Sequence, residues 1–170
     1  MTATDAELQG LAERLGSVLV ARGSTVALAE SCTGGWIAKC LTDVPGSSAW
    51  FDRGFVTYTN AAKHELLHVP MTTLDEHGAV SAATVEAMVA GALAAAPASD
   101  IAAATSGVAG PGGGSDDKPV GLVWLAWARR GHAPVARCVR LDGDREQIRR
   151  ATVYHALDGL IEEAEVPEIA

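Results

Sequence analysis

Apolar residues recur at helical spacing near both ends of the chain. Between residues 6 and 22, five apolar side chains are spaced to share one helix face: Leu8, Leu11, Leu15, Val18 and Leu19. Gly23 follows them as a natural helix stop. A second stripe follows Asp142 or Asp144, either of which suits a helix N-cap: Ile148, Val153, Leu157, Leu160 and Ile161. The pattern predicts an amphipathic first helix and an amphipathic last helix.

Shorter apolar runs between these helices predict strands. Residues 25–29 and 101–104 are nearly continuous apolar runs, which are typical of strands covered on both faces. Residues 50–59 are rich in aromatic and β-branched side chains, which favour a strand. Residues 121–128 and 135–141 flank a short turn and predict a hairpin. Because a hairpin is antiparallel, we expect an α/β fold with a mixed sheet.

Shorter helices are predicted between the strands. Residues 36–42 have a helical pattern, which the break at 44–46 ends with a proline and a glycine. Asn60 is a good N-cap for a short helix that carries Lys63 just beyond a strand end. Ser81 opens an alanine-rich helix that runs to about residue 96.

Two segments show no regular pattern. Residues 71–78 are polar, and we expect them to form a simple connection. Residues 105–119 contain five glycines and two prolines, which predicts a loop. A loop of this length is more than a connector, and loops that long are often functional.

Composition narrows the class of protein. A chain of 170 residues with 48% hydrophobic content suits a single domain with one core, spanning residues 1–170. The acidic start lacks the pattern of a signal peptide, and the apolar runs are too short for a membrane span of roughly 20 residues. The net charge of -8 disfavours nucleic-acid binding. We therefore expect a cytoplasmic protein with no nucleic-acid or membrane partner.

Cysteine usage agrees with that compartment. Cys32, Cys40 and Cys138 form an odd set with no Cys-x-x-Cys spacing. This set favours a reducing compartment over a disulfide framework and makes a poor zinc site. We expect no bound metal.

The segment 29–35 places a hydroxyl group on a strand-to-helix turn. Unpaired backbone N–H groups and the helix dipole at such a turn favour a developing negative charge, so Ser31 is a candidate nucleophile beside an oxyanion hole. The alternative is that Ser31 or Thr33 is an ordinary helix N-cap. Cys32 is a rival nucleophile, although a cysteine in this position is more often a small buried hydrophobe.

A serine nucleophile needs a base, and the five histidines form no pattern that suggests a Ser-His-Asp triad. Lys63 is the better candidate. A lysine of ordinary pKa is neutral in only about one molecule in a thousand near pH 7.4, so it must be desolvated or lie near another cation. Tyr58 lies five residues earlier and could relay the proton or orient the amine. The alternative is a strand aromatic followed by a solvated lysine.

The glycine-rich loop and one arginine are candidates for binding the substrate. Residues 106–114 let backbone amides approach a phosphate or a flat ring closely, although the segment is neither a Walker loop nor a Rossmann fingerprint. Flexible surface glycine is the alternative. Arg145, near the start of the last helix, could hold a phosphate or keep Lys63 neutral by like-charge repulsion, or could face solvent.

Five short segments occur in an order that resembles one known family. They are AESCTGG at 29–35, YTNAAK at 58–63, SGVAGPGGG at 106–114, KPVG at 118–121 and GDRE at 143–146. Over nearly the whole chain, this set resembles the CinA C-terminal domain family of nicotinamide-nucleotide amidohydrolases. The family's longer members carry a further N-terminal domain, so the resemblance implies a stand-alone version.

The resemblance implies a fold and a reaction. The fold would be a three-layer α/β/α sandwich with a mixed central sheet, assembled as a homodimer. The reaction would be hydrolysis of a pyridine mononucleotide, nicotinamide mononucleotide, to nicotinic acid mononucleotide and ammonia, with no metal or other cofactor. The alternative is a nucleotide-binding or regulatory module that keeps the pocket without turnover.

The resemblance also implies residue roles. Ser31 would be the nucleophile, and Lys63 and Tyr58 its activating pair. Substrate contacts would come from two glycine-containing segments and the last helix: Thr33, Gly34, Gly35, Thr105, Ser106, Gly107, Gly110 and Arg145. Ser106 stands where the family often has Thr, and it keeps the hydroxyl.

Overall fold

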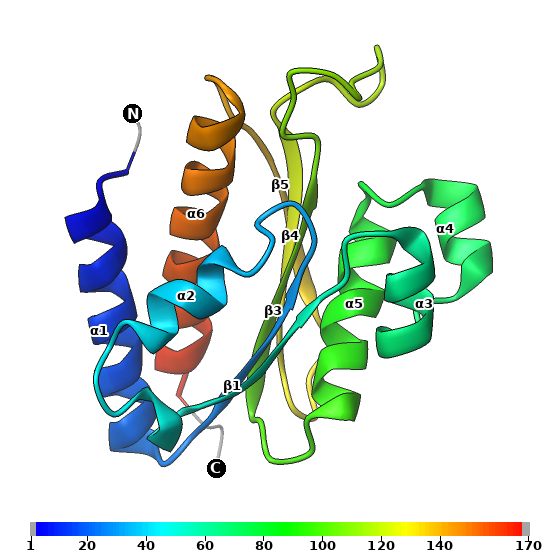
Figure 1. Ribbon diagram of the computed structural model, residues 1–170. Coiled ribbons are helices and arrows are strands. Elements are labelled where there is room, and N and C mark those ends of the chain that lie inside the picture. The colour runs from blue at the N-terminus through cyan, green and yellow to red at the C-terminus, as the bar shows by residue number, and fades with distance from the viewer. Residues whose placement is uncertain (1–2, 168–170) are drawn as a thin grey trace.

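A five-stranded mixed sheet runs through the middle of the computed structural model, which describes residues 3–167 (Figure 1). The strands are β1 (Val26–Glu30), β2 (Phe51–Val56), β3 (Ile101–Gly107), β4 (Leu122–Arg129) and β5 (Val135–Arg140), in the order β2-β1-β3-β4-β5. β1 is parallel to both β2 and β3, whereas β4 is antiparallel to its two neighbours. The predicted mixed sheet is confirmed.

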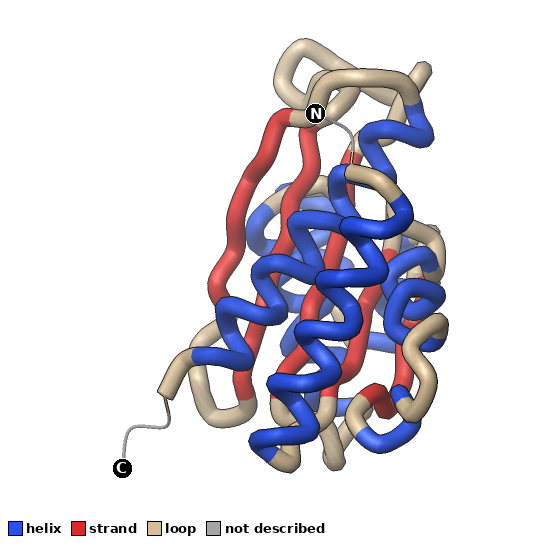
Figure 2. The backbone as a smooth tube through the Cα atoms, turned by 90° about the vertical axis from the view of Figure 1, so that its left-hand side faces the viewer, coloured by secondary structure: helices blue, strands red, loops and turns tan. Residues whose placement is uncertain are grey.

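Helices cover both faces of the sheet. One face carries α1 (Asp5–Arg22), α2 (Trp36–Thr42) and α6 (Arg145–Glu165), and Figure 2 looks onto this layer. The other face carries α3 (Asn60–Leu67), α4 (Met71–His77) and α5 (Ala82–Ala95). A short 3-10 turn, Ser47–Ala49, precedes β2. The three-layer α/β/α arrangement is confirmed. Among the described helices, none is long and apolar enough to cross a membrane.

The alternation of side chains along the strands builds two different cores. Val26 and Leu28 on β1 belong to the cluster under α1 and α6. Ala27 and Ala29 point to the other face and belong to the cluster under α5. The same face of β3 and β4 is also lined with alanine: Ala102, Ala104, Ala126 and Ala128. Because these side chains are small, the alanine-rich α5 can pack close to the sheet.

Two local predictions were wrong, and a third left two alternatives that the structure resolves. Thr59 caps α3, because its side chain accepts a hydrogen bond from the backbone N–H of Ala62 at 3.1 Å, so Asn60 is the first helical residue instead. The segment predicted as a polar connection forms α4, which begins after Pro70 and buries Leu74. Of the two candidate caps for the last helix, Asp144 is the N-cap.

The glycine-rich loop begins later than predicted. β3 continues through Thr105 and Ser106 to Gly107, and these residues pair with Leu125, Trp124 and Val123 of β4. Thr105 and Ser106 are almost fully buried. The glycines and prolines of residues 105–119 predicted a loop from Thr105 onward, but pairing with β4 extends the strand to Gly107. Two buried hydroxyl groups therefore lie at the end of a central strand.

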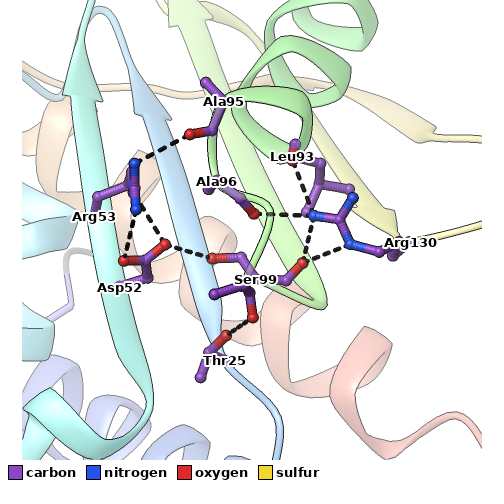
Figure 3. Close-up of polar contacts among 9 residues, drawn as sticks. Thr25, Asp52, Arg53, Leu93, Ala95, Ala96, Ser99 and Arg130 are labelled. Atoms are coloured by element: carbon purple, nitrogen blue, oxygen red, sulfur yellow. Dashed lines mark hydrogen bonds and ion pairs between the residues drawn. The ribbon is translucent and has the colours of Figure 1, made fainter.

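Two arginines hold the end of α5, which has no glycine cap (Figure 3). Arg130 donates hydrogen bonds to the backbone carbonyls of Leu93, Ala96 and Ser99 at 2.7 to 3.0 Å. Arg53 donates to another carbonyl of the same helix end at 3.1 Å. These charged donors replace the hydrogen bonds that the last carbonyls of a helix lack.

We expect Arg130→Ala to lower the free energy of unfolding by about 2 kcal/mol, because hydrogen bonds from a charged donor are the stronger kind. Arg129→Ala is the matched control, because among the described residues the Arg129 side chain donates one hydrogen bond, to the carbonyl of Val166 at 3.0 Å. Its effect should stay below about 1 kcal/mol. Urea unfolding followed by circular dichroism measures both. Equal effects for the two variants would contradict this account of the helix end.

Candidate active site

The candidate site lies where β1 and β3 end side by side. In the sheet, β1 lies between β2 and β3. The connection from β1 to β2 contains α2 and covers one face of the sheet, whereas the connection from β2 to β3 contains α3, α4 and α5 and covers the other face. In open α/β sheets, ligands bind at the carboxyl ends of the strands where the connections diverge in this way. Ser31 follows β1 directly, and its backbone N–H donates to the carbonyl of Thr105 at 3.0 Å. The end of β3 thus fixes the position of Ser31.

The side chain of Lys63 extends from α3 and contacts Ser31. Its Nζ donates a hydrogen bond to Ser31 Oγ at 3.0 Å. Lys63 lies in the first turns of α3 and is only 1% exposed, and Ser31 is 7% exposed. Nζ also donates to the backbone carbonyls of Thr57 and Tyr58, at 2.8 and 3.4 Å. The amine is therefore aimed at the hydroxyl by fixed backbone partners.

Burial changes the charge of this amine. It lowers the pKa of Lys63 from 10.5 to about 8, because the surroundings disfavour the charged form. At this pKa about one fifth of the amines are neutral near pH 7.4, compared with about one in a thousand for an exposed lysine. Within residues 3–167, no carboxylate forms a salt bridge with Lys63. Lys63 has the properties of a general base.

Glu30 shapes the turn that follows β1. Its carboxylate is 1% exposed and accepts hydrogen bonds from the backbone N–H groups of Gly35, Ile37 and Ala38 at 2.9 to 3.1 Å. The first N–H groups of α2 therefore already bind an anion, contrary to the expectation that the dipole of this helix faces a substrate. The sequence offered one signal for Glu30: an acid at the end of a buried strand immediately before a helix.

The hydroxyl groups of the turn are not helix caps. Gly35 occupies the N-cap position of α2 and makes no side-chain hydrogen bond there. Thr33 Oγ1 instead lies 2.9 Å from Thr105 Oγ1, and both side chains are buried. Gly34 and Gly35 have φ values of +61° and +95°, which favour glycine. The N–H of Gly34 donates to the carbonyl of Ser31 at 3.1 Å, which closes the turn.

Tyr58 and Arg145 meet at the rim of the site. The Tyr58 side chain is exposed, and its hydroxyl accepts a hydrogen bond from Arg145 Nη2 at 2.9 Å. Arg145 Nη1 donates to the carbonyl of Gly110 at 2.7 Å. Arg145 thus connects the candidate phenol to the glycine-rich loop. Among the described residues, no hydrogen bond joins the phenol to Ser31 or Lys63.

Packing explains two of the glycines in the loop region. A Cβ on Gly107 would lie 2.6 Å from Val123 Cγ2, and one on Gly110 would lie 2.6 Å from Val120 Cγ1. Gly110 also has a φ of +76°. Both positions therefore require glycine for close approach of the backbone, before any contact with a ligand is considered.

Cys32 is a poor nucleophile in this setting. Burial raises the pKa of its thiol to about 11, so the reactive thiolate is rare at neutral pH. Of the two adjacent candidates, the geometry and the charge state both favour Ser31. No group of three His, Cys, Asp or Glu side chains within residues 3–167 is arranged to hold a metal ion.

Sequence reasoning missed two further side chains beside the turn. Arg149 donates from Nε to the carbonyl of Cys32 and from Nη2 to the carbonyl of Thr33, both at 3.0 Å. Thr57 is fully buried, and its hydroxyl has no hydrogen-bond partner among the described residues. A signal for Arg149 existed, because it lies one helical turn after Arg145 and so shares its side of the helix.

Comparison with known proteins places this arrangement in a family. A model of the CinA C-terminal domain matches residues 8–164. The chain belongs to the CinA C-terminal domain family. The nicotinamide-nucleotide amidohydrolase PncC of Escherichia coli is 53% identical over 157 residues, which cover 92% of this chain and 94% of that protein. The protein of the same name from Pseudomonas putida is 55% identical over 152 residues, covering 89% and 94%.

Solved structures of the CinA superfamily share the fold. A superfamily protein from Klebsiella pneumoniae is 41% identical and superposes with a TM-score of 0.88, covering 92% of this chain and 97% of that one. Longer relatives also match: a CinA-like protein of Geobacter sulfurreducens is 52% identical over 164 residues, but these cover only 39% of its length. The CinA C-terminal domain therefore occurs both almost alone and within a longer chain.

Proposed function

We propose that this chain hydrolyses the carboxamide of nicotinamide mononucleotide to nicotinic acid mononucleotide and ammonia. The observation that carries the proposal is the buried hydrogen bond of 3.0 Å between Lys63 Nζ and Ser31 Oγ. A nucleophile paired with a base of lowered pKa is the arrangement that acyl transfer requires. We infer the substrate from the names of two similar proteins, both nicotinamide-nucleotide amidohydrolases.

The proposed reaction has two steps. Neutral Lys63 accepts the proton of Ser31 as Oγ attacks the carboxamide carbon, and the resulting ammonium group returns the proton to the leaving nitrogen. The carbon–nitrogen bond breaks, ammonia departs, and an acyl ester with Ser31 remains. Water then attacks the ester with Lys63 again as base, which releases the carboxylate product and restores the hydroxyl.

We place the rest of the substrate between the glycine-rich loop and Arg145. The guanidinium of Arg145 would attract the phosphate, and the glycine backbone of the loop allows close approach to it. The phosphate is remote from the reacting carbon, so its binding energy can orient the carboxamide at Ser31. Tyr58 completes the proposed activating pair from the rim, where Arg145 holds its hydroxyl.

An ammonia assay on the purified protein tests the proposal. We expect ammonia release from nicotinamide mononucleotide and much slower release from free nicotinamide, because the latter lacks the phosphate that supplies remote binding energy. Nicotinic acid mononucleotide, which has no carboxamide, is the blank. Tight binding of the mononucleotide without ammonia release would instead favour a regulatory module that has kept the pocket.

The pH dependence of the reaction follows from the environment of Lys63. Because only the neutral amine can accept the proton, kcat/KM should rise with pH to a plateau, with a midpoint near the lowered pKa of about 8. Below the midpoint the slope should approach a tenfold change per pH unit. Initial rates between about pH 6 and pH 9 measure the profile. A flat profile across that range would exclude Lys63 as the titrating base.

A further inference from the structure

Arg149 binds the backbone of the turn that carries the proposed nucleophile, Ser31. It extends from α6 and donates hydrogen bonds to two consecutive backbone carbonyls, those of Cys32 and Thr33, each at 3.0 Å. These carbonyls belong to the two peptide groups that follow Cys32 and Thr33. A planar guanidinium that binds two successive peptide groups restricts their rotation more than a single hydrogen bond would.

An aromatic ring supports this arginine. The Arg149 guanidinium lies 5.3 Å from the ring centroid of Trp36, within the range of a cation–π interaction. Trp36 is the first residue of α2 and so follows the same turn. The guanidinium is thus held in place by the ring of Trp36 and by the carbonyls of Cys32 and Thr33. This arrangement makes Arg149 a rigid support and not a mobile surface charge.

The hydrogen bonds from Arg149 determine the direction of the backbone N–H of Thr33. In a trans peptide group the C=O and the N–H point in opposite directions, so binding the carbonyl of Cys32 turns the N–H of Thr33 away from Arg149. Thr33 is fully buried. Within residues 3–167, this N–H has no hydrogen-bond acceptor, although the N–H groups of Gly34 and Gly35 both have one. A buried N–H that no protein acceptor occupies is available to bind an atom of a ligand.

We propose that Arg149 is a positioning residue that holds the Thr33 N–H as an oxyanion-hole donor for the tetrahedral intermediate on Ser31. This inference rests on the proposed function. When Oγ of Ser31 bonds to the carboxamide carbon, the carbonyl oxygen gains the electron pair and becomes an anion, which the preorganised N–H stabilises. Arg149 itself touches no substrate atom and acts through the peptide group that it binds.

Three variants test the proposal. Arg149→Met should lower kcat by about 10- to 100-fold while KM changes by less than about threefold, because the lost interaction forms only in the transition state. Arg149→Lys, which can still reach one carbonyl, should recover part of kcat. Arg150→Met is the matched control: its guanidinium also lies on Trp36, at 5.0 Å, but it bonds to Asp5 and Glu146 instead. This control should keep the kcat of the unmodified protein.

Inhibitor binding separates positioning from a general structural defect. Pyridine-3-boronic acid forms a tetrahedral anionic adduct when Ser31 Oγ donates its electron pair to boron and Lys63 takes the proton. Its affinity should fall in Arg149→Met by about the same factor as kcat, while the planar product nicotinic acid mononucleotide binds as before. Equal losses of affinity for both ligands, or an unchanged kcat, would overturn the proposal.

Two controls keep the outcomes distinct. If the unmodified protein releases no ammonia, the proposed function fails. The positioning role of Arg149 fails with it, because that role requires the reaction at Ser31. If Arg149→Met does not fold, as judged by its thermal unfolding, Arg149→Lys carries the test. A kcat for Arg149→Lys equal to that of the unmodified protein, with Arg149→Met unfolded, would assign Arg149 to stability and reject the positioning role.

Discussion

Ser31→Ala should reduce ammonia release from nicotinamide mononucleotide by roughly 10⁴- to 10⁶-fold in kcat, because it removes the hydroxyl on which the proposed acyl ester forms. The substitution removes one oxygen from a side chain that is 7% exposed, and the backbone N–H of residue 31 still donates to Thr105. The binding of the mononucleotide should therefore persist. The ammonia assay measures turnover, and isothermal titration measures binding in the same preparation.

Cys32→Ala is the matched partner of this variant. It removes the rival nucleophile, whose pKa is raised to about 11 by burial, and it should leave kcat within about tenfold of the unmodified protein. In a quenched reaction, fragmentation mass spectrometry should also locate the acyl group on Ser31 and not on the adjacent Cys32. Unchanged activity in Ser31→Ala, or an acyl group on Cys32, would refute the nucleophile assignment.

Lys63→Met should lower kcat by about 10²- to 10⁴-fold, the usual contribution of a general base. Methionine has a similar length and no charge, so it fills most of the space of a side chain that is 1% exposed. The sloped pH profile should disappear together with the base, and a residual rate should be nearly independent of pH. A residual rate that still rises with a midpoint near pH 8 would assign that titration to another group.

The same variant should reveal the cost of burying the amine. The pKa of Lys63 is about 8 in the folded protein and 10.5 in the unfolded chain, so between these values the unfolded chain binds more protons. The stability of the unmodified protein relative to Lys63→Met should therefore rise by about 3 kcal/mol as the pH increases through this window. Below pH 8 the full penalty applies, and Lys63→Met has its greatest relative advantage.

Urea unfolding of both proteins at about pH 7 and pH 10.5 measures this difference. Comparing the two proteins at each pH cancels the titration of all other groups. A stability difference that is the same at both pH values would show that Lys63 titrates alike in the folded and unfolded chains. The lowered pKa, and with it the charge state assigned to the base, would then be wrong.

The sequence pattern predicted the sheet and the meeting of Ser31 with Lys63 because both depend on strand ends. Each residue follows a segment whose apolar or β-branched character marks a strand, and parallel strands present their carboxyl ends at one edge. The N-cap of α3 was harder to predict, because Thr59 and Asn60 are adjacent polar residues and either type can cap a helix. Thr105 and Ser106 were included in the predicted loop because glycines and prolines follow them, and the local sequence does not show their pairing with β4.

For two contributors to the candidate site, Arg149 and Glu30, the sequence held a signal for the residue but did not show its partners. The carbonyls that Arg149 binds lie 116 and 117 residues away along the chain, and only the packing of α6 beside α2 brings them together. Glu30 is close in sequence to its partners, but its carboxylate could equally have faced a ligand. Its hydrogen bonds to the start of α2 depend on how the chain turns after β1.

The proposed nucleophile and base come from one continuous stretch, β1 through α3, whereas Arg145 and the glycine-rich loop, the proposed substrate contacts, come from the second half of the chain. The loop residues that follow Gly110 are therefore separate from the stretch that carries Ser31 and Lys63. An engineer could lengthen or replace residues 111–117 to admit a different amide without disturbing the backbone that aims Lys63 at Ser31. A change in selectivity obtained in this way should leave the alkaline midpoint of the reaction where it was.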